Sequence, residues 1–397
     1  VFGYQRRGEG LDQGAYRPLL GEKKDQRVNW TKEGTLMMPG LNPPVSGVQG
    51  QEMIREPKVG ILVLNWNNWG DTIRCLESLR TLSFRNHLVI LIDNGSGNDS
   101  VERLRDWMNG GRPAAPAGSD KRGEDRFCEG RYKGFRTLTF KDAGPFGGFS
   151  APVMILTGKN LGYAGGNNIG MDYALDNRCE YVWILNSDTI ADAKALAELV
   201  KPAESDKQIG MVGSRLLNDI AGPEESDLPA RSGSPSGIDV KYLSGASLLA
   251  RAACVRDAGK IDENYFLYGE EVDWCLRARK KGWKLLFRPG SIVSHSWGAS
   301  TNSKRIVRRF LGREIIRLTW EGFPIPGYYE ARNGIYFVRK NRHGLLVPYS
   351  IIRTLHVLFQ ILLYDDHKVG RWKIVLRGAR DGIKNRMGMT VDPSRPA

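Results

Sequence analysis

Asp188 is a candidate functional residue, because a carboxylate at its position in the chain could bind a metal ion. It lies in Asn186-Ser187-Asp188-Thr189, directly after the apolar run 181–185, and therefore at the end of a predicted strand. A carboxylate there can bind Mg²⁺ or Mn²⁺, which take oxygen ligands and bridge diphosphates. The alternative is a helix N-cap, in which Asp188 or Thr189 caps a helix over 191–200.

A group of acids follows an aromatic segment later in the chain. Glu270, Glu271 and Asp273 begin a predicted helix, where acids suit the positive end of the helix dipole. Asp273 can also pair with Arg277 four residues on. This structural explanation does not account for the aromatic residues before the acids. His295 follows another apolar run, and a lone histidine in that position is more often structural than a ligand.

Small polar side chains follow the first two predicted strands. Asn65 and Asn67 lie after the first, and Asp93 and Ser96 after the second. They could hydrogen-bond a base and a ribose, although the same residue types are ordinary in turns.

A glycine-rich segment opens a further helix and contains Asn160, Gly165, Gly166, Asn167 and Asn168. Glycines before a helix N-terminus let backbone N–H groups approach a phosphate. A dinucleotide fold would need GxGxxG after the first strand and an acid about 20 residues on, so the segment does not favour NAD binding.

The elements that position these residues alternate between strand and helix. The runs 59–64, 88–92, 153–156 and 181–185 are predicted strands, and helix-like spacing covers 72–81, 101–108 and 167–176. This order predicts an open, mostly parallel α/β sheet flanked by helices, with ligands at the carboxyl ends of its strands. We expect a disordered leader at 1–52, with the natural start near Met53, and a mobile surface loop at 109–150.

Charge separates the C-terminal quarter from the rest. The chain has 397 residues and a net charge of +14, and residues 301–397 hold 19 Lys/Arg against 7 Asp/Glu. The balance of 41% hydrophobic and 26% charged residues excludes a wholly disordered chain and a polytopic membrane protein. Five cysteines without a CxxC pair indicate neither a disulfide framework nor a zinc site, and favour a reducing compartment.

The segment 344–367 is the candidate membrane contact. It is apolar, but Arg353, His356, Gln360 and His367 would form one polar stripe on a helix. We therefore expect an amphipathic helix in a membrane surface, with nearby Lys and Arg facing anionic headgroups. The alternative is a helix packed on the rest of the protein.

Taken in order, these motifs resemble the inverting, GT-A-fold glycosyltransferases of family 2, particularly the rhamnosyltransferase-like branch of bacterial polysaccharide synthesis. The similarity runs from about 59 to 300, and Ser244-Gly245-Ala246 is a further matching motif within this range. It implies a GT-A domain at 53–300 and a helical, basic, membrane-associating region at 301–397. The sequence departs from the family pattern in having Asn186 as the first residue of the DxD-like motif, and Glu270-Glu271 where Glu-Asp is usual.

The resemblance implies roles for individual residues. The general base would be Glu271, or else Glu270, and the metal ligands would be Asp188 and His295, with Asp273 holding the helix start. The nucleotide-sugar pocket would be lined by Asn65, Asn67, Asp93, Ser96, Asn160, Gly165, Gly166, Asn167, Asn168 and Asn186.

The implied activity is Mg²⁺- or Mn²⁺-dependent transfer of a sugar from a nucleotide-diphosphate donor to a glycan or polyprenyl-linked hydroxyl, with inversion. The implied location is cytoplasmic, peripheral on the inner face of the plasma membrane. Rhamnose from a dTDP donor is suggested by the branch, and other hexoses from UDP or GDP stay open. A non-catalytic nucleotide-sugar or glycan-binding relative is the alternative. Nucleic acid is not an expected partner, because no recognised motif for it is present.

Overall fold

The computed structural model describes residues 55–108, 136–139, 153–217, 237–296, 303–310, 313–320, 325–341, 344, 346–364 and 368–393. Glu56–Arg308 and Ile316–Ala397 form one compact unit, and a second unit contains Val1–Arg55 with Arg309–Ile315. The predicted leader 1–52 lies outside the described residues. Of the predicted loop 109–150 the structure describes only β3 (Arg136–Thr139), a strand.

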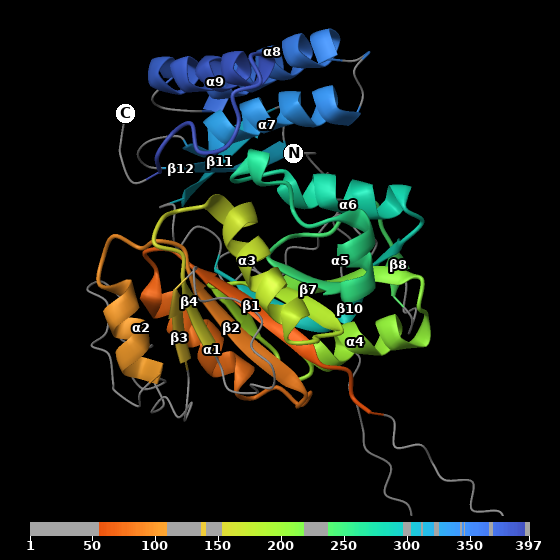
Figure 1. The fold of residues 1–397 in the computed structure, drawn as a ribbon. Helices are drawn as coiled ribbons and strands as arrows, with labels where there is room; N and C mark the ends of the chain where they lie inside the picture. Colours follow the sequence, from red (N-terminus) through yellow and green to blue (C-terminus); the bar gives the residue numbers. More distant parts are fainter. Residues whose placement is uncertain are drawn as a thin grey trace, which may run out of the picture. The chain divides into compact units, whose positions relative to one another are not determined.

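A ten-stranded mixed sheet organises the first unit (Figure 1). In spatial order its strands are β3, β4 (Val153–Leu156), β2 (His87–Asp93), β1 (Val59–Asn65), β5 (Tyr181–Asn186), β9 (Ser247–Arg251), β7 (Ile209–Leu217), β10 (Lys284–His295) and β6 (Thr189–Ala191), with β8 (Ile238–Asp239) paired to β10. The run from β3 to β5 is parallel, as is the β7–β10 pair, while β9, β6 and β8 pair antiparallel. The predicted fold class, an open, mostly parallel α/β sheet of GT-A type, is confirmed.

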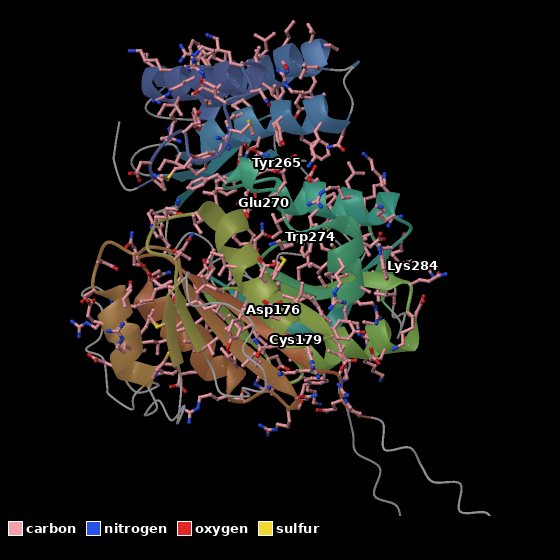
Figure 2. The ribbon with its side chains drawn as sticks, viewed as in Figure 1. Asp176, Cys179, Tyr265, Glu270, Trp274 and Lys284 are labelled. Atoms are coloured by element: carbon pink, nitrogen blue, oxygen red, sulfur yellow. The ribbon has the colours of Figure 1, made fainter. Side chains whose placement is uncertain are left out.

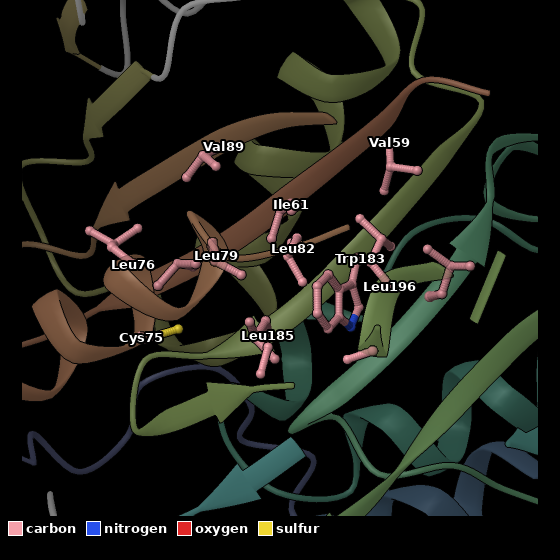
Figure 3. Close-up of a cluster of buried hydrophobic side chains, with 14 of the residues drawn as sticks. Val59, Ile61, Cys75, Leu76, Leu79, Leu82, Val89, Trp183, Leu185 and Leu196 are labelled. Carbon is pink, nitrogen blue, oxygen red and sulfur yellow. The ribbon is translucent and has the colours of Figure 1, made fainter. Parts of the chain in front are cut away.

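Helices cover both faces because side chains alternate along each strand. In β1, Val59, Ile61 and Val63 point into a core with α1 (Trp69–Leu79), α2 (Ser100–Met108) and α4 (Ala195–Ser205). Leu62 points into the opposite core, with α3 (Gly162–Asp176), α5 (Ala252–Ala258) and α6 (Glu270–Lys280). Figure 3 shows part of the first core around Trp183, whose indole nitrogen donates to Ser247 Oγ at 3.0 Å.

The parallel register brings the predicted polar turns to one edge of the sheet. Asn65 is aligned with Asp93, and Leu64 with Asn186. Asp93 is also aligned with Leu156, which leads into the glycine-rich segment. The candidate residues of four separate motifs therefore lie at the carboxyl ends of neighbouring strands, as predicted.

One structural alternative from the sequence is wrong. Neither Asp188 nor Thr189 caps a helix, because Thr189–Ala191 form β6 and pair antiparallel with Val293–His295 at the end of β10. Helix α4 begins only at Ala195, with Lys194 at its N-cap. The pairing places Asp188 beside His295, although 107 residues separate them in the sequence.

The region 301–397, predicted to be helical, holds three helices, α7 (Ile325–Asn341), α8 (Leu346–Tyr364) and α9 (Lys368–Ile383). Its first part is not helical, because β11 (Ser303–Phe310) and β12 (Arg313–Trp320) form a separate two-stranded sheet. Helix α8 contains an 18-residue window, Leu346–Leu363, that is long and apolar enough to cross a membrane by length and composition alone, and 12% of it is buried.

Candidate active site

A closed hydrogen-bond network joins the ends of β1 and β2. The Asn65 amide donates to Asp93 Oδ1 at 2.7 Å and to Ser96 Oγ at 3.1 Å. The Ser96 backbone N–H and hydroxyl both donate to the Asp93 carboxylate, at 3.0 and 2.6 Å. Asn65 and Asp93 are buried. These predicted pocket residues therefore come together, and the network holds the Asp93 carboxylate in one orientation.

Asn67 connects the same two turns at a more exposed position. It adopts the left-handed conformation with φ 57°, which asparagine tolerates better than most residues. Its backbone N–H donates to Ser96 Oγ at 2.9 Å, and its side-chain oxygen accepts from the Gly97 N–H at 2.8 Å. The two turns are thereby fixed to each other.

Asn94 is a buried residue of this region to which the sequence gave no role. Its amide nitrogen donates to Asn160 Oδ1 and to the Gly162 carbonyl, both at 3.1 Å, and its oxygen accepts from the Leu161 N–H. Asn160 in turn accepts from the Gly162 N–H at 2.8 Å. The Asn94–Asn160 pair thus fixes the start of α3 against the end of β2. A buried amide with complementary donors and acceptors could be recognised only after the two segments were brought together.

The glycines of α3 permit close packing. A Cβ added to Gly166 would lie 2.4 Å from Leu64 Cδ1, and one added to Gly165 would lie 2.8 Å from Leu161 Cβ. Both positions need the absence of a side chain whether or not a ligand binds nearby.

The two asparagines after these glycines also make contacts within the protein. Asn168 is buried, and its amide nitrogen donates to the Ile261 carbonyl and to Glu263 Oε1, while its oxygen accepts from the Ile261 N–H. Asn167 donates back to the Tyr163 carbonyl at 2.9 Å, and its buried oxygen has no hydrogen-bond partner within the part of the chain that the structure describes. The contacts assign Asn168 a structural function, and the predicted sugar-side contact of Asn167 or Asn168 stays a prediction.

Asp188 and His295 have the spacing of two ligands of one cation. His295 Nε2 and Asp188 Oδ1 are 3.1 Å apart, and both side chains are mostly buried. Adjacent ligands of an octahedral ion with bonds of about 2.1 Å stand about 3 Å from each other, so this pair fits a shared Mg²⁺ or Mn²⁺. Among the described residues no group of three or more His, Cys, Asp or Glu side chains surrounds a common point.

Helix α6 presents two glutamates at its first turn, directly after Gly269, which has φ 89°. Glu270 is 3% exposed, and burial together with the neighbouring Glu271 charge raises its pKa well above the ordinary value. Glu271 is partly exposed, and burial raises its pKa as well. Figure 2 labels Glu270 at this helix start, with Trp274 one turn further along. A carboxyl group with a raised pKa is suited to proton transfer near neutral pH.

Asp273, two residues further along α6, is an anchor of the helix. Its side chain is fully buried and accepts from Arg277 Nε and Lys340 Nζ, each at 2.9 Å. The predicted pair with Arg277 is therefore present, and Lys340 adds a cation from α7. Asp273 is buried within these ion pairs, and its predicted role of holding the helix start stays a prediction.

The segment Ser244-Gly245-Ala246 connects the two acidic groups. The Asn186 N–H donates to the Ala246 carbonyl at 3.0 Å, and the Tyr163 hydroxyl donates to the Gly245 carbonyl at 2.6 Å. A Cβ on Gly245 would lie 2.8 Å from that hydroxyl and 3.6 Å from Glu271 Cβ. Gly245 therefore lies near Glu271 and Tyr163, and the next residue, Ala246, is bonded to the Asn186 turn.

Tyr163 is a central residue of the site to which the sequence gave no role. Burial raises the pKa of its phenol, and the charges of Glu270, Glu271 and Asp188 raise it further. The phenol is thus within electrostatic reach of both acidic groups. Its only sequence signal is its position at the second residue of α3, beside Gly162.

Comparison with known proteins agrees with this arrangement. The family model described as glycosyl transferase family 2 matches residues 151–233. A low-salt glycan biosynthesis hexosyltransferase, Agl10, from Haloferax volcanii is 30% identical over 141 residues, which cover 32% of this chain and 45% of that protein. An N-acetylglucosaminyl-diphospho-decaprenol L-rhamnosyltransferase from Mycobacterium tuberculosis is 40% identical over 67 residues, covering 17% and 22%. The chain thus spans less than half the length of these curated relatives.

The structure of the mannosyltransferase PcManGT from Pyrobaculum calidifontis, in complex with GDP-Man and Mn²⁺, aligns with this chain over 84% of this chain and 89% of the PcManGT chain. The TM-score is 0.47 and the identity 10%, so this likeness adds no argument about ligands. The family-model match and the curated relatives agree with the family resemblance of the sequence, and residues 151–233 match glycosyl transferase family 2.

Proposed function

We propose that this protein is an inverting glycosyltransferase that moves a sugar from a nucleotide-diphosphate donor to a hydroxyl of a glycan or lipid-linked acceptor. The observation that carries the proposal is the connection of two acidic groups through one short segment. The Gly245 carbonyl accepts from the Tyr163 hydroxyl, the Ala246 carbonyl accepts from the Asn186 N–H, and a Cβ at Gly245 would lie 3.6 Å from Glu271 Cβ. A base and a diphosphate-binding group in one site are the two requirements of this transfer.

The general base in this proposal is Glu271. Glu270 is buried, and burial together with the neighbouring Glu271 charge raises its pKa well above the ordinary value, so it is the member of the pair that holds a proton more readily. A neutral Glu270 leaves Glu271 as the charged member of the pair, because two adjacent carboxylates do not ionise together readily. Glu271 is also the more exposed side chain, so an acceptor hydroxyl can reach it. It would take the proton of that hydroxyl during attack on the sugar.

The donor would lie across the ends of β1, β2, β4 and β5. Asp188 and His295 would hold a divalent cation, which neutralises charge on a departing diphosphate when it is bound. The backbone and side-chain groups of Asn67 and Asn186 border the same strand ends, with Asn65, Asp93 and Ser96 fixing the turn beneath a base or ribose.

Donor identity is tested by calorimetric titration with dTDP, UDP and GDP sugars, with Mg²⁺, with Mn²⁺ and with EDTA. We propose dTDP-rhamnose, supported by the likeness to the rhamnosyltransferase of Mycobacterium tuberculosis. We expect binding that requires metal and is lost in Asp188→Asn and His295→Ala. Preference for a UDP or GDP hexose would replace the rhamnose assignment. Absence of binding to every donor would favour a non-catalytic glycan-binding protein.

The base assignment is tested by Glu271→Gln and Glu270→Gln in a transfer assay with the donor so identified. Base assistance contributes about 10²–10⁴-fold, so Glu271→Gln should lower kcat by that factor while donor affinity stays within about threefold. Glu270→Gln should lower it much less, and Glu102→Gln on exposed α2 is the matched control. Full turnover in Glu271→Gln would refute the assignment.

We also propose that the protein contacts a membrane through 344–367, on the cytoplasmic face of the plasma membrane. Helix α8 exposes apolar side chains, among them Ile352, Leu355 and Phe359 at 67, 60 and 58%. Neighbouring α9 exposes cations, including Lys373, Arg377 and Arg380. Exposed apolar area beside cations fits an anionic lipid surface.

Flotation with phosphatidylglycerol vesicles tests this contact. We expect the protein to float with them, less so with phosphatidylcholine vesicles, and Leu355→Glu with Phe359→Glu to abolish flotation. Tyr242→Asp is the matched control, because Tyr242 is 62% exposed and lies outside the C-terminal helices. Equal flotation of all variants would refute the assigned surface.

A further inference from the structure

Arg332 is a charged side chain at the centre of α7 that is fully buried. Its guanidinium donates to the carbonyls of Tyr265 at 2.6 Å, Asn264 at 3.2 Å and Gly388 at 2.5 Å, and lies 4.6 Å from the ring centroid of Tyr329. Burying a guanidinium costs free energy unless its donors are used. Here one terminal nitrogen donates to the carbonyls of Asn264 and Tyr265. The other donates to the Gly388 carbonyl and the Thr390 hydroxyl, and Nε donates to Asn333 Oδ1.

Asn333, the next residue of α7, contacts the same loop. Its amide nitrogen lies 3.0 Å from the Tyr265 carbonyl, 2.7 Å from the Leu267 carbonyl and 2.7 Å from the Tyr268 carbonyl. The side chain is 2% exposed. Two consecutive α7 residues thus supply the donors for carbonyls that converge from one short loop, 264–268.

The loop needs these donors because its backbone is strained. Phe266 and Tyr268 adopt the left-handed region with φ 63° and 70°, which costs roughly 1–3 kcal/mol for each such residue. The conformation turns neighbouring carbonyls toward α7. Without donors those buried carbonyls would be unsatisfied, and the loop would relax to an unstrained form.

The same loop fixes both elements that carry the candidate active site. It leads directly into Gly269 and the first turn of α6, which holds Glu270 and Glu271. The Phe266 carbonyl also accepts from the Tyr163 N–H at 2.7 Å, at the start of α3. A change in this loop would therefore move the glutamates and Tyr163 together.

We propose that Arg332 and Asn333 are positioning residues that hold loop 264–268 so that the glutamates of α6 face the acceptor hydroxyl. They act on the reaction through the loop backbone. The proposal rests on the glycosyltransferase function proposed above. It makes the basic C-terminal region a part of the active-site architecture.

The test uses Arg332→Gln and Asn333→Asp in the full chain. Misplacing a reacting group by about 1 Å can cost 10²-fold, so kcat should fall by about 10–100-fold while the donor dissociation constant changes less than about threefold. Arg339→Gln is the matched control. Arg339 is on the same helix and donates to the carbonyls of Gly382 and Ile383, away from the loop.

Hydrogen exchange of peptides covering 264–275 gives a readout that needs no sugar transfer. We expect faster exchange there in both loop-directed variants and unchanged exchange there in Arg339→Gln. Unchanged exchange in the two loop-directed variants would overturn the proposal. So would a fall in kcat that is proportional to the loss of thermal stability and is equally large in the Arg339→Gln control. If the wild-type protein transfers no sugar, the proposed function fails. Hydrogen exchange of 264–275 that is slow in the wild type and fast in the two loop-directed variants would still support the conclusion that Arg332 and Asn333 hold the loop.

Discussion

Replacing Asp273 with Asn should destabilise the protein strongly, although the two side chains have nearly the same size and shape. The carboxylate is fully buried and accepts from Arg277 and Lys340, each at 2.9 Å. Removing one partner of a fully buried ion pair costs about 3–5 kcal/mol, because the other charge is left uncompensated. The two cations retain 21% and 30% side-chain exposure, and water at these positions reduces the expected cost to about 2–4 kcal/mol.

The measurement is thermal and urea unfolding at pH 7, with Asp239→Asn as the matched control. Asp239 pairs with Arg279 on the same helix at 3.0 Å, but its side chain is 60% exposed, so its loss should cost no more than about 1 kcal/mol. In a double-mutant cycle with Lys340→Met, Asp273→Asn should show a coupling energy of about 1–3 kcal/mol. An Asp273→Asn protein as stable as wild type, or one that loses kcat with unchanged stability, would refute the anchoring function and favour direct chemistry by this carboxylate.

Three further predictions follow from local geometry. Gly166→Ala should destabilise the protein by about 1–3 kcal/mol, because its Cβ would lie 2.4 Å from Leu64 Cδ1, whereas Gly97→Ala, with no heavy atom within 4 Å, should stay within about 0.5 kcal/mol in urea unfolding. The pKa of Glu270 is raised in the folded protein, so the folded protein keeps a proton at pH values where the unfolded chain, with an ordinary pKa near 4.5, has released it. This contribution to the free energy of unfolding is lost as pH rises. In Glu270→Gln the free energy of unfolding should therefore differ less between pH 5 and pH 8 than in the wild type. Burial raises the Cys75 thiol pKa to about 12, and iodoacetamide at pH 8 should label it, by peptide mass spectrometry, only after unfolding. Each prediction has an outcome that would contradict it: labelling of Cys75 in the folded protein, a stability that depends more steeply on pH in Glu270→Gln than in the wild type, or an unchanged free energy of unfolding in Gly166→Ala.

Four strands of the sheet, β1, β2, β4 and β5, were predictable because their burial depends on local runs of apolar residues. The predicted 153–156 coincides with β4, and the runs 59–64 and 181–185 miss β1 and β5 by one residue each. Helix α3 was harder. It begins at Gly162, five residues before the predicted start, because Gly165 and Gly166 lower helix propensity but allow the helix to pack against β1.

The parts of the site that the sequence did not predict depend on contacts between distant segments. The spacing around Asp188 fits a helix cap as well as a metal ligand, and only the pairing of β6 with the end of β10 excludes the cap. Asn94 and Tyr163 gave no signal of their own, since each is defined by hydrogen bonds to a segment more than 60 residues away. Residue type and turn position identified candidates, but tertiary pairing decided their partners.

The predicted boundary at residue 300 follows the change in charge, and the contacts of α6 cross it. Lys340 completes the ion pairs of Asp273, while Arg332 and Asn333 satisfy carbonyls of the loop before Glu270. A chain ending at 300 would leave a buried carboxylate without one cation and a strained loop without its donors. Since each of these losses acts on α6, the proposed function of α7 is to maintain the geometry of the proposed base, whereas α8 and α9 carry the surface proposed for a membrane.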